Sequence, residues 1–412
     1  MSTAQDTSAS APPEPSGTGP AAERQTLPLL PLLALATAVF VTSLTETLPA
    51  GLLPAMSGDL GVSAAATGQT VTVYALGTAL TAIPLTAATA GWGRKRLLLV
   101  SMAGFAAANT VTAVSSSYGL TMAARFVAGV AAGLAWALLA GYARRLAPER
   151  LQGRAMAVAM AGIPVALSLG VPAGTYLGSV TDWRIAFLAM TGLTVLLLVW
   201  IAAAVPDRPG SRTGERPGML RASKVPGVPA VLFVTLVFVL AHTLLYAYVA
   251  AFLGDLGLGD ATDLVLLEFG AASLVSIWIV GARIHRQLRL LMVAGTLLVA
   301  LAAALLGVFA EHTVLVHLAA VLWGLGWGGV PTLLQTAAGE AAGDRADGAQ
   351  AMLVTLWNVA MAAGGVIGGL LLDTAGSGAF PWTLLALLVP VLVVVLRARV
   401  HGFPPGQDRA GA

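Results

Sequence analysis

Apolar segments long enough to cross a lipid bilayer recur along most of this chain. The first lies within residues 27–56 and reads LPLLPLLALATAVFVTSLTETLPAGLLPAM. A transmembrane helix needs about 20 mostly apolar residues, and only helices or closed barrels can span a bilayer. Runs of this length extend, with approximate limits, over residues 28–53, 64–90, 97–117, 119–143, 155–180, 184–205, 229–253, 261–282, 288–310, 313–337, 348–372 and 380–398. The sequence therefore predicts an all-α integral membrane protein with about twelve transmembrane helices.

The composition excludes most soluble classes of protein. Only 10% of the 412 residues are charged, whereas a soluble domain carries about 25%. The net charge of +3 does not indicate nucleic-acid binding, because the cations lie in connections between apolar segments. The chain has no cysteine, which excludes disulfides, thiol nucleophiles and thiolate metal sites. No metal-ligand spacing and no nucleophile–base arrangement is visible, so we expect no metal, no cofactor and no enzyme activity.

The connections divide the chain into two halves. Residues 1–26, rich in Ala, Ser, Pro and Gly, are typical of a disordered tail. The least apolar long connection, residues 206–228, separates a predicted six-helix bundle at residues 27–205 from a second at residues 229–400. Residues 401–412 form a second tail.

Positive charge is distributed unevenly between the two ends of the predicted helices. Of the 22 lysines and arginines, all but Arg125 and Arg184 fall in the tails and on alternate connections. Since cytoplasmic connections carry the excess of Lys and Arg, both termini and the central connection are predicted to be cytoplasmic. We expect a multi-pass protein of the cell membrane, working as a monomer.

The two halves repeat each other. The motif Gly58-Asp59-Leu60-Gly61 recurs 196 residues later as Gly254-Asp255-Leu256-Gly257, and several glycines recur at a spacing of 195. Six helices repeated in one orientation predict a pseudo-two-fold axis along the membrane normal, with a substrate site between the bundles. The same spacing relates Glu46 to His242, and we expect these two residues to face each other across the axis.

Several short motifs resemble one family of membrane transporters. They are Thr45-Glu46-Thr47-Leu48-Pro49-Ala50-Gly51, Ala124-Arg125-Phe126-Val127-Ala128-Gly129, Gly170-Val171-Pro172-Ala173-Gly174, Asp182-Trp183-Arg184 with Phe187, Trp323-Gly324-Leu325-Gly326, Pro331-Thr332-Leu333-Leu334-Gln335 and Trp357-Asn358. The chain resembles the major facilitator superfamily over roughly residues 30–400. Within it, the similarity is to the twelve-helix drug:proton antiporters, which include sugar, chloramphenicol and purine exporters. The resemblance implies export of a small molecule in exchange for protons.

The connection between the second and third predicted helices departs from the family pattern. Gly93-Arg94-Lys95 is present, but Ala90 stands where the family has an aspartate. The resemblance therefore does not carry over an acidic latch between the halves. The basic residues Arg94, Lys95 and Arg96 remain suited to a helix C-terminus or to lipid phosphates.

Charged residues within the apolar segments are the first candidates for function, because their burial in a membrane is costly without a partner or water. Glu46 and Arg125 lie at similar depths below the outer surface, so they are able to pair. A carboxyl group under the opposing influences of burial and a nearby arginine suits proton coupling; the alternative is a static ion pair between two helices. His242 and Glu268 are the other coupling candidates, although a single histidine on an apolar helix is more often structural.

Small residues and polar or aromatic residues complete the candidate set. Gly129, Gly133, Gly170, Gly174 and Gly178, with Pro172, have the small-residue spacing of close helix packing, and we expect the glycine series in the fifth helix to form a bendable contact between the halves. The predicted substrate cavity is lined by Tyr74, Trp136, Tyr246, Gln335, Trp357 and Asn358.

The sequence therefore favours a secondary transporter that exports a small organic molecule in exchange for protons by alternating access. Two alternatives remain open: an uncoupled or uptake facilitator, and a non-transporting membrane receptor with the same fold. The identity of the substrate does not follow from the sequence.

Overall fold

The computed structural model describes residues 27–89, 91–148, 151–210 and 222–404, and these residues form helices with no β-strand among them. The predicted tail at residues 1–26 lies outside the described residues. The same is true of Ala90, of residues 211–221 in the central connection and of residues 405–412.

The first half contains six spanning segments, the fifth of which is interrupted. They are α1 (Leu29–Leu60), α2 (Ala64–Ala88), α3 (Arg94–Val114), α4 (Tyr118–Leu146), the series α5 (Gln152–Met160), α6 (Gly162–Val165), η2 (Ala166–Gly170) and α7 (Val171–Val180), and α8 (Trp183–Ala204). The interrupted series includes Pro164 and Pro172, and η2 between them is a π-helix. Proline has no N–H for the helical ladder, so an irregular turn beside it is physically expected.

The second half follows the same order with different interruptions. Its elements are α10 (Val228–Tyr246), α11 (Val249–Asp255), η3 (Gly259–Ala261), α12 (Thr262–Val308), α13 (Thr313–Trp327), α14 (Val330–Ala342), η4 (Gly343–Arg345), α15 (Ala346–Ala375) and α16 (Ala379–Arg397). Helix α12 contains two spans, Gly259–Ile284 and Arg286–Val308, separated by the non-helical backbone of Gln287.

Within the described residues, eleven segments are long and apolar enough to cross a membrane. Helix α2, with 25 residues of which none is charged, is a further apolar segment of spanning length. With α2 included, the chain has twelve spanning segments. The predicted all-α membrane fold is confirmed.

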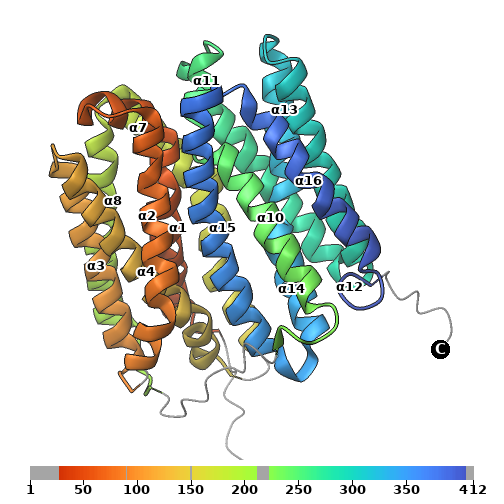
Figure 1. Cartoon of the computed structure of the whole chain (residues 1–412). Helices are drawn as coiled ribbons and strands as arrows, with labels where there is room; N and C mark the ends of the chain where they lie inside the picture. The colour runs from red at the N-terminus through yellow and green to blue at the C-terminus, as the bar shows by residue number, and fades with distance from the viewer. Residues whose placement is uncertain (1–26, 90, 149–150, 211–221, 405–412) are drawn as a thin grey trace, which may run out of the picture.

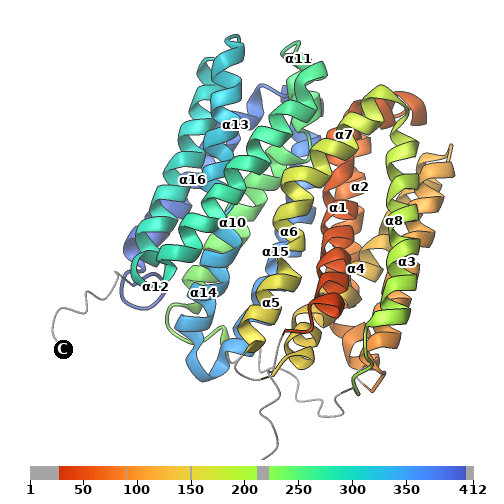
Figure 2. The ribbon, with the colours of Figure 1, turned by 180° about the vertical axis from the view of Figure 1, so that it is seen from behind.

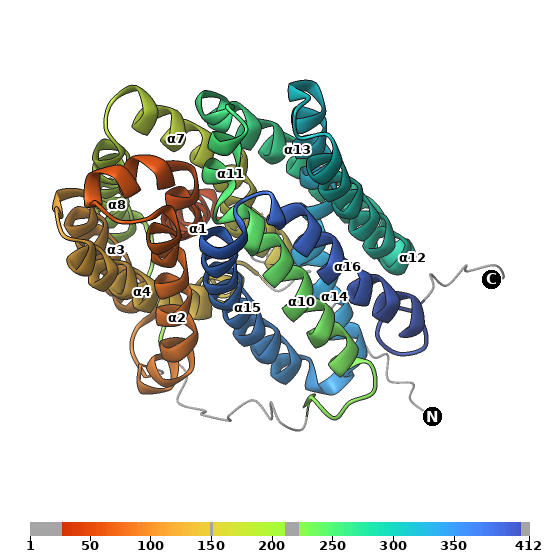
Figure 3. The ribbon, with the colours of Figure 1, turned by 45° about the horizontal axis from the view of Figure 1, so that its top comes forward.

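The twelve segments form two bundles that lie side by side (Figure 1). Helix α2 of the first bundle contacts α15 of the second, as Figures 1 and 3 show. Seen from behind in Figure 2, the series α5–α7 approaches the second bundle, and η2 and α7 contact α12. The bundles therefore meet along two seams.

Equivalent hydrogen bonds support the internal repeat. Thr78 Oγ1 donates to the carbonyl groups of Tyr74 and Gly129, at 3.2 and 3.0 Å. In the second half, Ser273 Oγ donates to the carbonyl groups of Phe269 and Gly324, at 2.8 and 3.2 Å. Each residue of the second set lies 195 positions after its counterpart, so the spacing of the glycines corresponds to equivalent helix contacts.

The two ends of the molecule differ in charge. We call the end that carries Asp59, Asp182 and Asp255 the acidic end, and the end that carries Arg94 and Arg145 the basic end. The acidic end is at the top of Figure 1.

The turns at the acidic end of the two halves make equivalent hydrogen bonds. Asp59 accepts hydrogen bonds from Trp183 Nε1 at 3.1 Å and from Arg184. Asp255, its counterpart in the repeat, accepts one from Ser377 Oγ at 2.5 Å. In each bundle, the turn after the first spanning helix is thus tied to the start of the sixth.

The two bundles are hydrogen-bonded to each other near the acidic end. Tyr248 Oη, between α10 and α11, donates to the carbonyl of Gly365 in α15 at 2.8 Å. Gln69 Nε2 of α2 donates to both Tyr248 Oη and the Gly365 carbonyl at 3.1 Å. In the second seam, a Cβ atom added to Gly270 of α12 would collide with the backbone of Ser168 in η2. The structure therefore represents a state in which the bundles are closed at the acidic end.

Candidate functional site

Glu46 lies in the middle of the molecule on α1. Its side chain is partly exposed, although its neighbours Thr45 and Leu48 are buried. The indole of Trp136, on α4, lies within hydrogen-bonding reach of the carboxylate, and Arg125 acts on it electrostatically. Glu46 therefore has both a route to solvent or ligand and a nearby cation.

Arg125 is completely buried on α4. Its Nε donates to the carbonyl of Thr70 at 3.4 Å, and its guanidinium lies 4.9 Å from the centre of the Tyr74 ring. Within the described residues, neither terminal nitrogen of this guanidinium has a hydrogen-bond partner. Glu46 and Arg125 are therefore neighbours without a direct ion pair in this state.

Other buried polar atoms near Arg125 also lack partners. Asn109 Nδ2 donates to Thr45 Oγ1 at 3.1 Å, but Asn109 Oδ1 accepts no hydrogen bond within the described residues. The hydroxyls of Thr70 and Thr121 are likewise unpartnered. Thr121 precedes Arg125 by one helical turn and so lies on the same face of α4. Because unpaired buried polar groups are costly, this part of the first bundle is suited to hold water, a proton or a polar group of a ligand.

The sequence pointed to Glu46, Arg125, Tyr74 and Trp136 as candidates within this set but not to Thr45, Thr70 and Thr121. A polar residue within an apolar span is a sequence signal for a site residue. Threonines are so frequent in these helices that this signal does not distinguish the ones near Arg125. Their proximity to Arg125 depends on how α2, α3 and α4 pack.

His242 lies within a cluster of aromatic rings in the second bundle, which we call the aromatic cluster: His242, Tyr246, Phe269, Trp323, Trp327 and Trp357. Its imidazole stacks on Trp327, with ring centres 3.6 Å apart and planes 8° apart. Trp323 Nε1 donates to His242 Nδ1 at 3.1 Å. The hydrogen bond at His242 Nδ1 therefore comes from Trp323 in this state, and the expectation that His242 and Glu46 face each other across the axis stays a prediction.

The remaining members of the aromatic cluster contact one another and the rings that hold His242. Tyr246 stacks on His242 at 5.2 Å and Phe269 contacts Trp323 at 4.7 Å between ring centres. Trp357 contacts Trp327 at 5.7 Å and is partly exposed. These rings give the second half an apolar, polarisable wall suited to planar organic molecules.

The other predicted cavity residues make different contacts. Gln335 is exposed, and its carbonyl accepts a hydrogen bond from Gln350 at 2.6 Å. Asn358 is buried, and its Nδ2 donates to the Val354 carbonyl within its own helix at 2.9 Å. These hydrogen bonds join neither residue to Glu46 or to the aromatic cluster, so the structure does not group them with these residues.

Glu268 lies apart from Glu46. Its carboxylate contacts His317 Nδ1 of α13 at 2.8 Å, and the two side chains are 27% and 24% exposed. Exposed apolar side chains flank the pair on both helices, including Leu264 and Leu267 on α12 and Val314 on α13. Glu268 and His317 therefore lie toward the lipid-facing surface of the second bundle.

The glycines of α4 pack against α2. A Cβ atom on Gly129 would collide with the backbone of Tyr74, and one on Gly133 would lie 3.2 Å from the Cα atom of Ala82. Close approach of these helices therefore requires glycine, as the small-residue spacing predicts.

The glycines of η2 and α7 face α1 of their own half. Added Cβ atoms on Gly170, Gly174 and Gly178 would meet, in this order, Phe40, Leu48 and Leu52. Pro172 is buried in the first turn of α7. These three glycines therefore pack within the first half and do not form the expected contact between the halves. In this segment, the backbone of Ser168 makes that contact, against Gly270 of α12.

The basic residues at the start of α3 contact the segment that follows α8. The backbone N–H of Lys95 donates to Asp207 Oδ1 at 2.9 Å, and that of Arg94 donates to the Arg208 carbonyl at 2.8 Å. The guanidinium of Arg96 lies over Trp92 at 4.7 Å. Asp207 therefore places a carboxylate at the N-terminus of α3, although Ala90 provides none.

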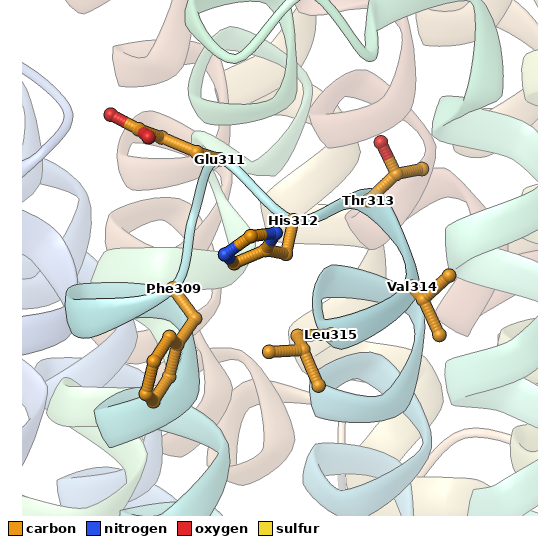
Figure 4. Close-up of a pocket in the computed structure, with 6 residues that line it drawn as sticks. All are labelled: Phe309, Glu311, His312, Thr313, Val314 and Leu315. Carbon is orange, nitrogen blue, oxygen red and sulfur yellow. The ribbon is translucent and has the colours of Figure 1, made fainter.

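A surface hollow of about 470 Å³ lies in the loop between α12 and α13 (Figure 4). It is lined by Phe309, Glu311, His312, Thr313, Val314 and Leu315. In Figure 4 the Glu311 carboxylate points away from the other side chains. The hollow is at the surface of the acidic end and does not include the central residues.

Comparisons with known proteins agree with the architecture. A family model described as Major Facilitator Superfamily matches residues 35–364. The purine ribonucleoside efflux pump NepI of Salmonella enteritidis is 28% identical over 375 residues, which cover 90% of this chain and 94% of the pump. A chloramphenicol efflux pump of Mycobacterium tuberculosis is 32% identical over 379 residues, covering 87% and 90%. The fold is similar to that of the human organic anion transporter MFSD10, with a TM-score of 0.66, 19% identity and coverage of 91% of this chain and 99% of that chain.

Proposed function

The chain belongs to the major facilitator superfamily, and on that premise we propose that it exports a small organic molecule across the cell membrane in exchange for protons. Membership of this transporter family confirms the expectation that the protein is not an enzyme. The proposal concerns the direction of transport, its coupling and its substrate.

The observation that carries proton coupling is the arrangement of Glu46 and Arg125. The carboxylate is partly exposed, while the neighbouring guanidinium is fully buried, and its two terminal nitrogens have no partner among the residues that the structure describes. An ionised Glu46 is attracted to this cation, whereas a protonated Glu46 is not. Gain and loss of one proton therefore changes the forces on α1 relative to α4.

The proposed cycle alternates between two closures of the bundles. The present state is closed at the acidic end through Gln69 and Tyr248. If the basic end is cytoplasmic, as the distribution of Lys and Arg supports, this state receives substrate from the cytoplasm. Rocking of residues 27–205 against residues 229–400 then exposes the same site outside, where Glu46 takes up a proton.

The proposed substrate binds between Glu46 and the aromatic cluster. Aromatic walls with a few polar groups favour planar, polar organic molecules. The similar proteins are named as pumps for purine ribonucleosides and for chloramphenicol. We therefore propose a nucleoside or an aromatic antibiotic as the first substrate classes to test, and a single chain as the working unit.

Transport into proteoliposomes under an imposed pH gradient tests the proposal. The panel consists of purine ribonucleosides and chloramphenicol, with the wild type and Glu46→Gln compared at equal reconstitution. The wild type should accumulate one of these compounds against its gradient, and Glu46→Gln should not. Accumulation by Glu46→Gln equal to that of the wild type would overturn the assignment of coupling to Glu46.

Two alternatives give other results in the same assay. An uncoupled facilitator would equilibrate the substrate in both variants but accumulate it in neither. A receptor without transport activity would bind a compound, detected as a thermal shift, and move none. An uptake system would reverse the direction of accumulation with respect to the pH gradient.

A further inference from the structure

The hydroxyl of Tyr246 is buried and has no hydrogen-bond partner within the described residues. Tyr246 is the last residue of α10, and only 6% of its surface is exposed. A buried phenol normally finds a partner, because an unpaired hydroxyl loses its hydrogen bonds to water. The partner of Tyr246 is therefore expected to be a group that is absent or differently placed in this state.

The aromatic cluster fixes the position of the Tyr246 ring. His242 stacks on one side of it at 5.2 Å, Phe269 lies at 5.7 Å and Trp323 packs edge-on at 6.0 Å. His242 is itself held by Trp323 and Trp327. Because its ring is confined on several sides, the Tyr246 hydroxyl is presented to the first bundle by a rigid support.

The groups that Tyr246 faces lie on α1 of the first bundle. Thr47 is within reach, and because its hydroxyl donates to the Ser43 carbonyl at 2.8 Å, it could act toward Tyr246 only as a neutral acceptor. Glu46 is the titratable group that acts on Tyr246 electrostatically. Arg125 and Tyr74 lie beyond Glu46, and His242 is the titratable neighbour on the helix of Tyr246 itself. The first bundle thus presents one ionisable acceptor to this donor.

We propose that Tyr246 is the residue through which the second bundle responds to the protonation of Glu46: its phenol donates a strong hydrogen bond to the ionised carboxylate, and that bond weakens when the carboxylate is protonated. This inference rests on the proposed function. A hydrogen bond to an ionised acceptor is stronger than one to a neutral acceptor. Since the donor and the acceptor belong to different bundles, the bond ties the bundles together in a way that depends on one proton.

Arg125 and Tyr246 then have complementary roles. Arg125 attracts the ionised carboxylate from within the first bundle, and Tyr246 attracts it from the second. A substrate hydroxyl or amide placed between Glu46 and Tyr246 would compete for the same hydrogen bonds, so the proton and the substrate would displace one another. Competition at one carboxylate is sufficient to couple the two in an exchanger.

The test is the variant Tyr246→Phe, which removes the donor and keeps the ring. The pH at which substrate binding is half-maximal should shift upward by about one unit, because loss of a charge-assisted hydrogen bond changes the protonation equilibrium by about tenfold. Accumulation driven by the pH gradient should fall by about the same factor. Tyr176→Phe, at an exposed tyrosine, is the matched control and should leave both measurements unchanged.

Two further variants protect the test against a change in folding. Incorporation of 3,5-difluorotyrosine at position 246 keeps the size of the ring and makes the phenol a stronger donor, so it should shift the pH of half-maximal binding downward. In Glu46→Gln, the additional change Tyr246→Phe should have no further effect on the pH dependence, since both act on one hydrogen bond.

The outcomes separate this inference from the proposed function. If Glu46→Gln loses pH-driven accumulation but Tyr246→Phe and the difluoro variant bind with the pH dependence of the wild type, the role of Tyr246 is overturned and the coupling role of Glu46 stands. If Glu46→Gln itself still accumulates substrate, the proposed function fails first.

Discussion

The guanidinium of Arg125 combines complete burial with incomplete hydrogen bonding. It has one long hydrogen bond to the Thr70 carbonyl and a ring contact with Tyr74, and its terminal nitrogens are unpartnered within the described residues. A buried charge in this situation is costly unless a counter-charge compensates it. Glu46 is the acid that acts on Arg125 electrostatically, which makes the two residues dependent on each other.

Arg125→Ala should therefore impair stability as well as export. The change removes the contact with Tyr74, leaves a cavity and deprives Glu46 of its cation, so we expect a loss of about 2 kcal/mol in the free energy of unfolding. Arg125→Lys keeps the charge and should recover part of the stability. Thermal unfolding in detergent measures the stability of both variants, and the proteoliposome assay measures their export. An Arg125→Ala variant as stable and as active as the wild type would contradict the mutual dependence of Glu46 and Arg125.

At the residue scale, the sequence predicted Glu46 and Arg125 as neighbours but did not predict the aromatic rings that surround His242. The depths of Glu46 and Arg125 below the outer surface were sufficient to predict that they are neighbours, because both depths follow from the rise per residue of a helix. The repeat related His242 to Glu46 but carried no information on its side-chain contacts. Trp323 and Trp327 occupy positions that correspond to Ala128 and Ala132 in the first half, so only the second half has indoles that enclose the histidine.

Helix α12 approaches the backbone of the first bundle most closely at a glycine. A Cβ atom on Gly270 would collide with the backbone of Ser168, whereas one on Gly281, farther along the same helix, would meet nothing within 4 Å. The closed acidic end therefore depends on glycine at position 270 and not at position 281.

Gly270→Ala should shift the equilibrium toward opening of the acidic end. Overpacking of this kind costs about 1–3 kcal/mol, which corresponds to a change in population of about 5- to 150-fold. Because the chain has no cysteine, the single change Thr72→Cys provides a unique label at a buried position near Gly365. Its reaction with maleimide should become about tenfold faster in Gly270→Ala and stay unchanged in Gly281→Ala; equal rates in the two would exclude the role of Gly270.

Asp207 stabilises the first turn of α3 from a distant part of the chain. Its carboxylate accepts hydrogen bonds from the backbone N–H groups of Lys95 and Arg208. Asp207→Ala should lower stability by about 1 kcal/mol, the usual effect of losing a side-chain acceptor at a helix N-terminus. The exposed Asp260 provides the control Asp260→Ala. Equal thermal unfolding of the two variants would show that Asp207 contributes nothing.

At the element scale, hydropathy located the spanning segments well and their partners poorly. Twelve apolar runs were sufficient to predict twelve spans, and Pro164 and Pro172 marked the irregular fifth segment. The glycine spacing predicted close packing, but which helix fills the space depends on the arrangement of the whole bundle. Likewise, Glu268 was visible in the sequence, whereas its partner His317 is determined by the packing of α12 on α13.

The asymmetry of charge between the two ends is a property of the whole molecule. Most Lys and Arg residues lie at the basic end or in the tails, and the acidic turns lie at the opposite end. If the basic end is cytoplasmic, a membrane-impermeant thiol reagent on intact cells should label Ser116→Cys, which is exposed at the acidic end, and not Gly91→Cys at the basic end. Labelling of Gly91→Cys alone would reverse the orientation and the proposed direction of transport.

The most direct test of proton exchange is to let the substrate gradient drive the protons. Proteoliposomes are loaded with the transported compound and with a pH-sensitive dye, and are then diluted into substrate-free buffer without a pH gradient. As substrate leaves, the wild type should carry protons inward and acidify the lumen, whereas Glu46→Gln should release substrate without moving protons. Equal acidification by Glu46→Gln and the wild type would contradict the assignment of the transported proton to Glu46.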